Sequence, residues 1–467
     1  MIKQSLKKTK ILATIGPASS GQEVLEAIIR AGVNGVRLNF SHGTHDEHAE
    51  VIDRVRRISK KLAKPIAIVA DLQGPKIRLG NLPAEGLPLI AGQKVEFAEG
   101  ESYEDGIIPI QHDISQYVKR GQPVYLRDGL VEVEVTRVTG KSVHATVRNP
   151  GIVYSKQGIN LPETDLGGDI LTPKDVEDIK FAASHDADYV ALSFVQTAED
   201  IVALKDRLKK LKSDMAVIAK VETKAAAENL EAIVEVSDGL MVARGDLAIE
   251  TKPETVPVLQ QRIIELARDE QKICIVATHM LESMISSPQP TRAEVSDVAT
   301  AVVQGADAVM LSGETAIGKH PVEAVALMRR VIIYTENNRA DSLSASDFGE
   351  HTRRNAISAA AITLARQLNA KVILAETSSG QTARNLCSFR PDQLVVGVTD
   401  QQRVFQQLAL LWGARSYVIK NPQTAAAETM QLLRHEHNVA TGDVVVRASG
   451  RQPGVTGGTD TLHIQVV

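Results

Sequence analysis

Side chains suited to binding phosphate and a hard metal ion stand where several short apolar runs of this sequence end. Lys220 and Glu222 close the run MAVIAKVE, and Asp246 closes GLMVARGD. Two carboxylates are too few for a Ca²⁺ cage but suit Mg²⁺, which completes its shell with water and substrate phosphate. The alternative use of these carboxylates is an ordinary salt bridge with Lys220 or Arg244.

Positive charge accompanies the two carboxylates. Arg37, Arg78 and Arg244 join Lys220 as donors that match phosphate oxygens. The chain contains no Walker A sequence (GxxxxGK followed by Ser or Thr), so a nucleotide would not be held by a P-loop. No nucleophile and base stand at a spacing that indicates covalent catalysis. The pattern therefore favours phosphoryl transfer, in which positioning and charge neutralisation do most of the work.

Other polar residues also stand where apolar runs end. Side chains alternate along a strand, so Arg37, Asn39 and Ser41 share one face of the run VRLNFS. A single residue of this kind is more often a solvated loop residue, but the repetition at most of the runs favours a functional site. The further members of this set are Asp71, Thr278, His279, Ser312 and Glu314.

Eight apolar runs alternate with amphipathic, helix-like stretches, which predicts a parallel sheet. Eight strands close a (β/α)₈ barrel, whose active site lies at the C-terminal ends of the strands. An open doubly wound sheet is the alternative, and we favour the barrel. The runs span residues 10–16, 36–41, 65–71, 189–194, 215–222, 239–246, 273–280 and 307–314.

Two segments depart from this period. Residues 72–158 contain alternating runs such as KVEFAEG and SVHATVRN between glycine-rich turns, which predicts an inserted all-β domain. Residues 341–467 predict a second, smaller α/β domain, which leaves 1–71 and 159–340 for the barrel. The single tryptophan, Trp412, is expected to pack in a core because large aromatic side chains are usually buried.

The composition excludes several classes of protein. The 467 residues include 53 Lys and Arg against 57 Asp and Glu, and 3% are aromatic, which argues against a nucleic-acid partner. No apolar run approaches the ~20 residues that span a bilayer, so we expect no membrane partner. Two cysteines cannot form a disulfide framework, and the sequence therefore predicts a cytoplasmic protein.

Long ordered segments of the sequence resemble the pyruvate kinase family. They include TKILATIGPAS, GVRLNFSHG, DLQGPKIR, GINLP, VIAKVE, SDGLMVARGDLAIE and GADAVMLSGETAIGKHPVEAV. The resemblance covers essentially the whole chain. It implies a (β/α)₈ TIM barrel, an inserted β-barrel lid domain after the third strand and a C-terminal α/β domain. The implied reaction transfers a phosphoryl group from phosphoenolpyruvate to ADP, giving pyruvate and ATP at the final step of glycolysis.

The resemblance also implies roles for individual residues. Lys220 resembles the lysine that stabilises the transferring phosphoryl group, and Glu222 and Asp246 resemble the ligands of Mg²⁺ or Mn²⁺. Thr278 and the backbone of Gly245 and Asp246 resemble the contacts to the substrate carboxylate.

Arg37 resembles the arginine that holds phosphate, so Lys220, Thr278 and Arg37 are the implied catalytic residues. The lid would exclude water, which competes for the phosphoryl group. Ser312 and Glu314 fall where the family has a polar network behind the proton given to the enolate. The implied nucleotide contacts are Asn39, His42 and Arg78.

Two departures from the family pattern bear on ligands. Gln157 replaces a lysine that contacts the nucleotide in many members, and Lys156 beside it is a candidate substitute. Lys76 replaces the glutamate that accompanies a need for K⁺, so we expect the chain not to require K⁺. The family's monovalent-cation ligands would be Asn39, Ser41 and Asp71.

The resemblance further implies a homotetramer and a phosphorylated allosteric effector. Thr377, Ser379 and Thr382 lie between an apolar run and a helix-like stretch, and hydroxyls and free amides at a helix N-terminus can bind an anion. We expect a sugar monophosphate or AMP here, beneath the turn 450–458. The alternatives to a kinase are a Mg²⁺-dependent pyruvate-enolate lyase or aldolase, and an inactive sugar-phosphate sensor.

Overall fold

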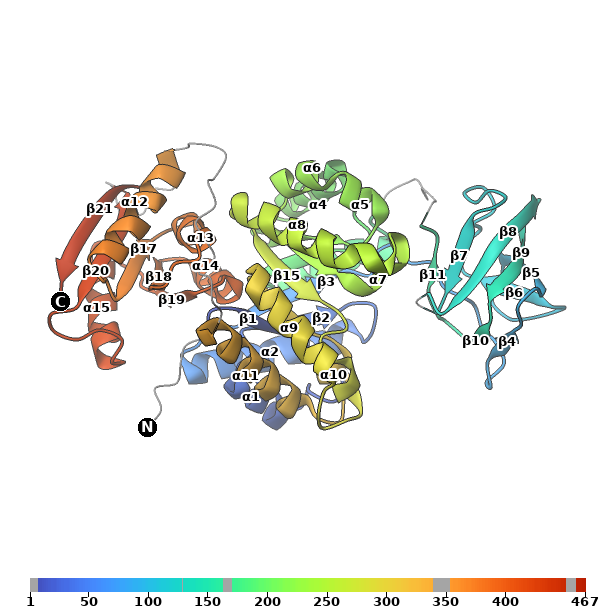
Figure 1. The fold of residues 1–467 in the computed structure, drawn as a ribbon, viewed down its shortest axis with the longest axis horizontal. Helices are drawn as coiled ribbons and strands as arrows, with labels where there is room; N and C mark the ends of the chain where they lie inside the picture. Colours follow the sequence, from blue (N-terminus) through green and yellow to red (C-terminus); the bar gives the residue numbers. More distant parts are fainter. Residues whose placement is uncertain (1–6, 128, 163–169, 339–352, 451–458) are drawn as a thin grey trace.

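The computed structural model describes residues 7–127, 129–162, 170–338, 353–450 and 459–467. A central barrel separates two smaller bodies, the strands β4 to β11 at one end and the C-terminal elements from α12 onward at the other (Figure 1). Among the described residues, no helix has both the length and the apolar character to cross a membrane.

Eight parallel strands form a closed ring, which confirms the barrel over the open sheet. The first strand pairs with both the second and the last, and this double pairing closes the ring. In chain order the strands are β1 (Lys10–Thr14), β2 (Gly35–Asn39), β3 (Ala67–Asp71), β12 (Tyr189–Leu192), β13 (Ala216–Val221), β14 (Gly239–Ala243), β15 (Ile273–Ala277) and β16 (Ala308–Leu311).

Helices surround the ring and begin and end at recognisable signals. Thr172 accepts from the backbone N–H of Asp175 and Asp175 bonds back, a reciprocal cap followed by a proline at the first helical position. Gly32 ends the first helix at φ 146°. The helices of the barrel are α1 (Gln22–Ala31), α2 (His45–Leu62), α3 (Pro173–Ser184), α4 (Ala198–Lys210), α5 (Lys224–Glu228), α6 (Leu230–Val236), α7 (Arg244–Glu250), α8 (Val256–Asp269), α9 (Arg292–Gln304), α10 (Gly313–Ala316) and α11 (Pro321–Asn338), with 3₁₀ turns η1 (Pro253–Thr255) and η2 (Glu282–Ile285).

The strands are shorter than the apolar runs that predicted them. The pairing of β14 with β15 ends at Ala243 and Ala277, and α7 begins at the next residue. Arg244 and Asp246 therefore lie in a helix, although the sequence analysis placed them at the end of a strand. Thr278 and His279 follow β15 in the left-handed region, at φ 67° and 52°, and turn the chain away from the ring.

Alternation along the strands divides the core into two layers. In β13, Val217 and Val221 pack outward against the helices, whereas Ala216 and Ile218 face the interior of the ring. By the same period of two, Lys220 follows Ile218 on the inner face. The barrel pattern thus aims the polar residues at the strand ends into the mouth of the ring.

The strands β4 to β11, which lie between β3 and α3, form a separate all-β unit with its own core, which we call the lid. The sequence predicted a β-barrel here, and the observed pairing is a six-stranded mixed sheet in the order β11-β7-β8-β9-β5-β6 beside a β10-β4 pair. Its strands are β4 (Leu87–Leu89), β5 (Lys94–Glu99), β6 (Ile107–Ile110), β7 (Pro123–Leu126), β8 (Val131–Thr139), β9 (Ser142–Asn149), β10 (Gly151–Val153) and β11 (Ile159–Asn160).

The C-terminal elements form an α/β unit that packs on the N-terminal ends of the barrel strands. Tyr189, the first residue of β12, donates its hydroxyl to the carbonyl of Gln407 at 2.9 Å, and Trp412 is buried as predicted. The sheet order is β19-β18-β17-β20-β21, and only the last pair is antiparallel. The elements are α12 (Arg353–Gln367), β17 (Val372–Glu376), α13 (Gln381–Ser388), β18 (Leu394–Thr399), α14 (Gln402–Gln407), η3 (Leu408–Leu410), β19 (Ala414–Val418), α15 (Ala425–His435), β20 (Val444–Gly450) and β21 (Thr459–Val466).

Candidate active site

A buried lysine stands at the centre of the polar cluster in the mouth of the barrel. The ammonium of Lys220 donates to the hydroxyl of Ser193 at 2.6 Å. It also lies 3.2 Å from Glu222 Oε2 and 3.5 Å from Asp71 Oδ1. These side chains lie on, or directly after, three neighbouring strands of the ring: β3, β12 and β13. Closure of the ring therefore brings them together.

Arg37 extends the cluster to the second strand. Its Nε donates to Asp71 Oδ2 at 2.5 Å, and its Nη1 donates to the hydroxyl of Thr14 at 3.2 Å. Asp71 therefore holds one cation on each oxygen, because Lys220 lies beside the other. The shared carboxylate fixes the two positive groups next to each other despite their mutual repulsion.

Burial and charge pairing act in opposite directions on this cluster. Burial favours neutral forms, but for Lys220 the carboxylates of Asp71 and Glu222 outweigh it and hold the pKa above its ordinary value. For Asp71, burial is outweighed by Arg37 and Lys220, and its pKa is lowered. Burial raises the pKa of Glu222, with a partial offset from Lys220. The lysine is thus held charged at neutral pH.

The carboxylates at this site fit a divalent metal. Glu222 Oε1 accepts from the backbone N–H of Phe194 at 2.8 Å, while the buried Oε2 has the ion pair with Lys220 but no hydrogen-bond partner among the described residues. Asp246 lies close enough for its charge to raise the pKa of Glu222. Among the described residues no group of three or more His, Cys, Asp or Glu could hold a metal. Two hard oxygen ligands are a donor set for Mg²⁺, which takes water and phosphate as its other ligands.

Lys76 reaches from the base of the lid to the same site. Its ammonium lies 3.3 Å from Asp246 Oδ1, and four fifths of its side chain is buried. Gly158 makes room for it, since a Cβ there would come within 2.6 Å of Lys76 Cε. A lysine that only extended into solvent would not make this contact.

Thr278 and Gly245 are brought together at the start of α7. The Thr278 hydroxyl accepts from the backbone N–H of Gly245 at 2.9 Å. The guanidinium of Arg244 donates to the carbonyls of Thr278 and His279 at 2.7 and 2.8 Å and pairs with Asp297. Arg244 therefore holds the left-handed turn after β15 in place. The contact with phosphate that its charge suggested stays a prediction.

The predicted nucleotide contacts lie along the rim. Asn39 Oδ1 accepts from the backbone N–H of Ser41 at 3.2 Å, so these two predicted cation ligands are adjacent in a turn. Burial, followed by Arg78 and Arg37, lowers the pKa of His42. Arg78 donates to the carbonyl of Lys156 at 3.1 Å across the two chain crossings into the lid.

The substitution at Gln157 has a local use. Its side-chain oxygen accepts from the backbone N–H of Tyr154 at 2.8 Å and closes the turn before β11. Lys156 beside it lies at φ 64° and is exposed. Its ammonium is accessible, so the substitution of Lys156 for the missing lysine stays a prediction.

Ser312 and Glu314 occupy the last strand end. Glu314 is completely buried and its carboxylate accepts from the backbone N–H groups of Leu281 and Ser312, at 2.9 and 2.7 Å. Burial raises its pKa. The Ser312 hydroxyl is buried and has no hydrogen-bond partner in the part of the chain that the structure describes.

Three contributors to the site escaped the sequence analysis. Ser193, Thr14 and the backbone N–H of Phe194 bind Lys220, Arg37 and Glu222 respectively. Ser193 follows β12 in the run YVALSF, so the rule of polar residues after strand ends could have found it. Nothing in the sequence pattern distinguishes Thr14 or a backbone amide.

The predicted effector residues lie in the C-terminal unit. Gly380, at φ 83°, precedes α13. The hydroxyls of Thr382 and Thr459 lie 2.7 Å apart, and Arg384 donates to the carbonyl of Ser379 at 3.0 Å. The backbone N–H of Thr377 bonds to Val398. Residues 451–458 of the predicted closing turn lie outside the described residues.

A closed eight-stranded barrel with a polar cluster at the C-terminal ends of its strands is the arrangement of a (β/α)₈ enzyme. Comparison with known proteins is more specific. Residues 6–325 match the family model "Pyruvate kinase, barrel domain" and residues 355–465 match "Pyruvate kinase, alpha/beta domain". The chain is 37% identical to pyruvate kinases of Staphylococcus aureus strains MRSA252 and USA300 over 472 aligned positions, covering 99% of this chain and 81% of each relative. The chain belongs to the pyruvate kinase family.

Proposed function

We propose that this chain transfers the phosphoryl group of phosphoenolpyruvate to ADP and releases pyruvate and ATP. The family assignment makes it a phosphotransferase of glycolysis. The observation that carries the proposal is the charged Lys220, held between Asp71 and Glu222 beside Asp246. A cation placed before the reaction stabilises charge as it moves between the two oxygens, at no cost of reorganisation.

Each residue of the cluster has a task in this reaction. Lys220 and Arg37 neutralise the phosphoryl oxygens, and Asp71 keeps both cations in place. The N–H groups of Gly245 and Asp246 and the Thr278 hydroxyl bind the substrate carboxylate. Glu222 and Asp246 would hold Mg²⁺ or Mn²⁺, which supplies charge neutralisation at the phosphates.

The nucleotide lies, on this proposal, toward Asn39, His42 and Arg78 at the rim. Arg78 bridges to Lys156 at the lid's return crossing, so nucleotide binding and lid position are linked through one guanidinium. A lid that closes over the site excludes water, which would otherwise accept the phosphoryl group. We assign residues 72–158 to this lid.

Lys76 takes the place of a monovalent cation in this proposal. Its ammonium already lies in the site, at Asp246. A second cation would be repelled by it, so Asn39, Ser41 and Asp71 need no K⁺. The chain is therefore proposed to be active with Mg²⁺ alone.

Regulation and assembly complete the proposal. Thr377, Ser379 and Thr382 at the start of α13 would bind the phosphate of a sugar monophosphate or of AMP, and the assembly would be a homotetramer. An effector would act by favouring one of two arrangements of the subunits.

A coupled assay tests the proposed reaction directly. Purified protein with phosphoenolpyruvate, ADP and Mg²⁺ should release pyruvate and ATP in equal amounts, and omission of ADP should stop both. Pyruvate release without ADP would indicate a phosphatase, and release of neither product would contradict the proposal.

A further inference from the structure

A short turn at the mouth of the barrel carries two of the predicted ligand contacts from β2 into α2. Residues 40–44, which we call the rim turn, contain Ser41 and His42. At the start of the turn, the backbone N–H of Phe40 donates to the carbonyl of Asp71 at 3.0 Å, which continues the pairing of β2 with β3. The chain then leaves the sheet, so the positions of Ser41 and His42 depend on the helices that pack behind the turn.

Two helices donate hydrogen bonds to backbone carbonyls of the rim turn. Lys174, in the first turn of α3, donates its ammonium to the carbonyl of Phe40 at 2.6 Å. His48, near the start of α2, has its Nε2 2.9 Å from the carbonyl of His42. A carbonyl oxygen can only accept, so Nε2 carries the proton of this bond. The two donors therefore hold the turn on either side of Ser41.

A buried carboxylate directs Lys174 onto the turn. About half of the lysine side chain is exposed, but Asp178, one helical turn further along α3, is buried and accepts from its ammonium at 2.6 Å. The other oxygen of Asp178 lies 2.7 Å from Nε2 of His45 in α2. The first turn of α3 is itself anchored, because Asp175 accepts from the backbone N–H of Gly74 at 3.1 Å. The ammonium is thus held at the carbonyl instead of extending into water.

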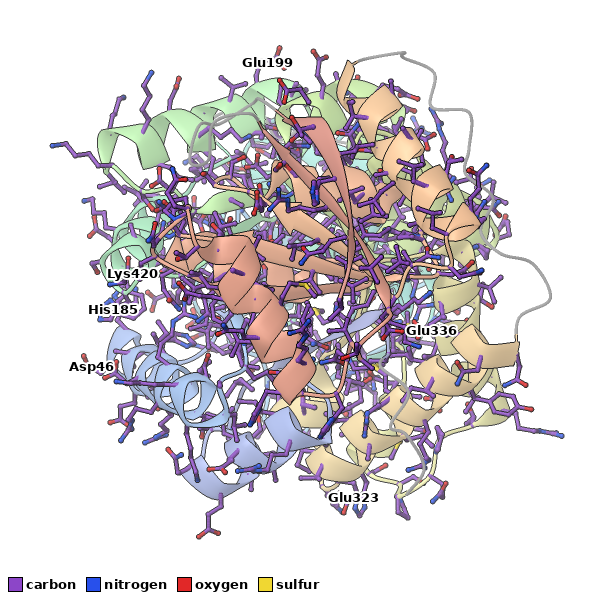
Figure 2. All side chains as sticks on the ribbon, turned by 90° about the vertical axis from the view of Figure 1, so that its left-hand side faces the viewer. Asp46, His185, Glu199, Glu323, Glu336 and Lys420 are labelled. Atoms are coloured by element: carbon purple, nitrogen blue, oxygen red, sulfur yellow. The ribbon has the colours of Figure 1, made fainter. Side chains whose placement is uncertain are left out.

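Aromatic rings fill the space between the rim turn and the two helices. Phe40 is buried, and its ring meets that of Phe181 edge-on at a centroid distance of 5.9 Å. Phe181 also stacks with His45 at 4.4 Å and with His185 at 4.2 Å. Figure 2 labels His185 and Asp46, the residue after His45, at one edge of the molecule. This packing fixes the side chain of Phe40, and the two donors fix the backbone that follows it.

Polar groups at this place are costly if packing is their only task. His48 is buried, and burial lowers its pKa below the ordinary value. Asp178 is a buried carboxylate, and apolar side chains of similar volume often pack such a place at no loss of stability. Apolar side chains could not donate to a carbonyl, however. Groups that bind a ligand must be held within about 0.5 Å of their productive positions by the side chains behind them. Precision of the rim turn therefore explains these polar residues better than stability does.

We propose that Lys174 and His48 are positioning residues that set the affinity for ADP by holding the rim turn in place. The inference rests on the proposed kinase reaction, in which this turn lies on the nucleotide side of the site. The groups proposed to act on phosphoenolpyruvate are held separately, since Asp71 binds both Arg37 and Lys220. Loss of either positioning residue should therefore act on ADP and leave phosphoenolpyruvate and the transfer step largely unaffected.

The experiment combines calorimetric titration of ADP with Mg²⁺ into the full chain and steady-state kinetics. Lys174→Met and His48→Leu should each raise the Kd and the KM of ADP about tenfold, because each removes one hydrogen bond to the turn. The kcat and the KM of phosphoenolpyruvate should change by less than about threefold.

Two further variants serve as controls. Lys180→Met is the matched control for Lys174→Met, because Lys180 is an exposed lysine of the same helix that pairs with Glu177. It should bind ADP like the wild type. His48→Gln should restore most of the affinity that His48→Leu loses, because the glutamine amide can donate to the same carbonyl.

Three outcomes would overturn the proposal. They are wild-type ADP affinity in both Lys174→Met and His48→Leu, a KM of phosphoenolpyruvate that rises as much as that of ADP, and a His48→Gln variant as weak as His48→Leu. If Lys174→Met unfolds because Asp178 loses its counter-charge, the double variant with Asp178→Asn gives the same comparison without that buried charge.

The calorimetric comparison does not involve turnover. Equal ADP affinity of all these proteins would therefore contradict this inference alone. Saturable binding of ADP without release of pyruvate from phosphoenolpyruvate would contradict the proposed reaction alone.

Discussion

The two ends of the barrel bury positive charge in opposite ways. At the C-terminal end, Lys220 lies between Asp71 and Glu222, and these carboxylates raise its pKa despite burial. At the N-terminal end, the described hydrogen bonds of Lys10 and Lys64 go to carbonyl oxygens, and burial lowers the pKa of both lysines to about 8.

Burial is similar at the two ends, so the counter-charge decides the sign of the shift. A buried lysine with two carboxylates keeps its proton for catalysis at any physiological pH. A buried lysine without a carboxylate loses its proton more readily, because burial favours the neutral form.

Removal of the paired cation should have the largest effect. Lys220→Met should lower kcat by about three to five powers of ten, similar to the loss of an arginine finger, with little change in KM. The reason is that the lysine acts on charge that develops in the transition state. Steady-state kinetics with the coupled assay measures both constants.

Lys224→Met is the control for this variant, because Lys224 is an exposed lysine four residues away. It should keep the wild-type kcat. A wild-type kcat in Lys220→Met would remove Lys220 from the mechanism.

Reversal of the charge at the lid should create a requirement for K⁺. The wild type should be substantially active with Mg²⁺ in a tetraalkylammonium buffer free of K⁺ and NH₄⁺. Lys76→Glu should become activated by K⁺ about tenfold or more, since a charge interaction of ~1–4 kcal/mol is replaced at this site. Rates measured across a K⁺ titration test this.

The same change at a distant surface position, Lys60→Glu on α2, should leave the K⁺ response unaltered. Strong K⁺ activation of the wild type would contradict the role of Lys76 while leaving the kinase assignment intact.

The predicted effector residues at the start of α13 would form an anion site built on hydroxyls instead of cations. Thr382→Ala should keep basal kcat but raise the half-saturating concentration of a sugar monophosphate or AMP about tenfold, because a charge-assisted hydrogen bond of ~1.5–3 kcal/mol is lost. Activation curves measure this shift.

Thr363→Ala on the exposed face of α12 serves as the comparison. Equal activation of all three proteins would exclude Thr382 from effector binding.

The smallest effect concerns stability at the N-terminal end. The pKa of Lys64 is lowered from its ordinary value of 10.5 to about 8 in the folded chain. At pH values between these two, the unfolded chain therefore binds more protons than the folded chain. Stability from this group therefore rises as pH increases from about 8 to about 10.5. The free energy of unfolding of the wild type relative to Lys64→Gln should increase over that window.

Denaturant unfolding at pH 7.5 and 9.5 measures the difference, and Lys60→Gln should show none. A difference that is constant with pH would mean that Lys64 is not held at a lowered pKa.

Local patterns were sufficient for the elements of the barrel. Eight apolar runs predicted eight strands, and Thr172 followed by Pro173 is the kind of local pair that begins a helix, as it does for α3. The period of two along β13 placed Lys220 on the inner face. These features depend on side chains a few residues apart, whose preferences act before any long-range contact forms.

The contacts that give the site its chemistry depend on long-range closure. The sequence analysis placed Asp246 on a strand, and it lies in α7 because pairing with β15 stops at Ala243. Lys76 meets Asp246 across 170 positions, and Ser193 meets Lys220 across 27. No spacing rule predicts such pairs.

The sequence by itself therefore determined the barrel, its inserted and C-terminal units, and which charged residues stand at the strand ends. Only the tertiary structure decided which cations receive a carboxylate, like Lys220, and which, like Lys64, have only carbonyl partners among the described residues. The physical reason is that charge pairing depends on distance through space and on exclusion of water. Both arise only when the ring closes and the C-terminal unit covers its base.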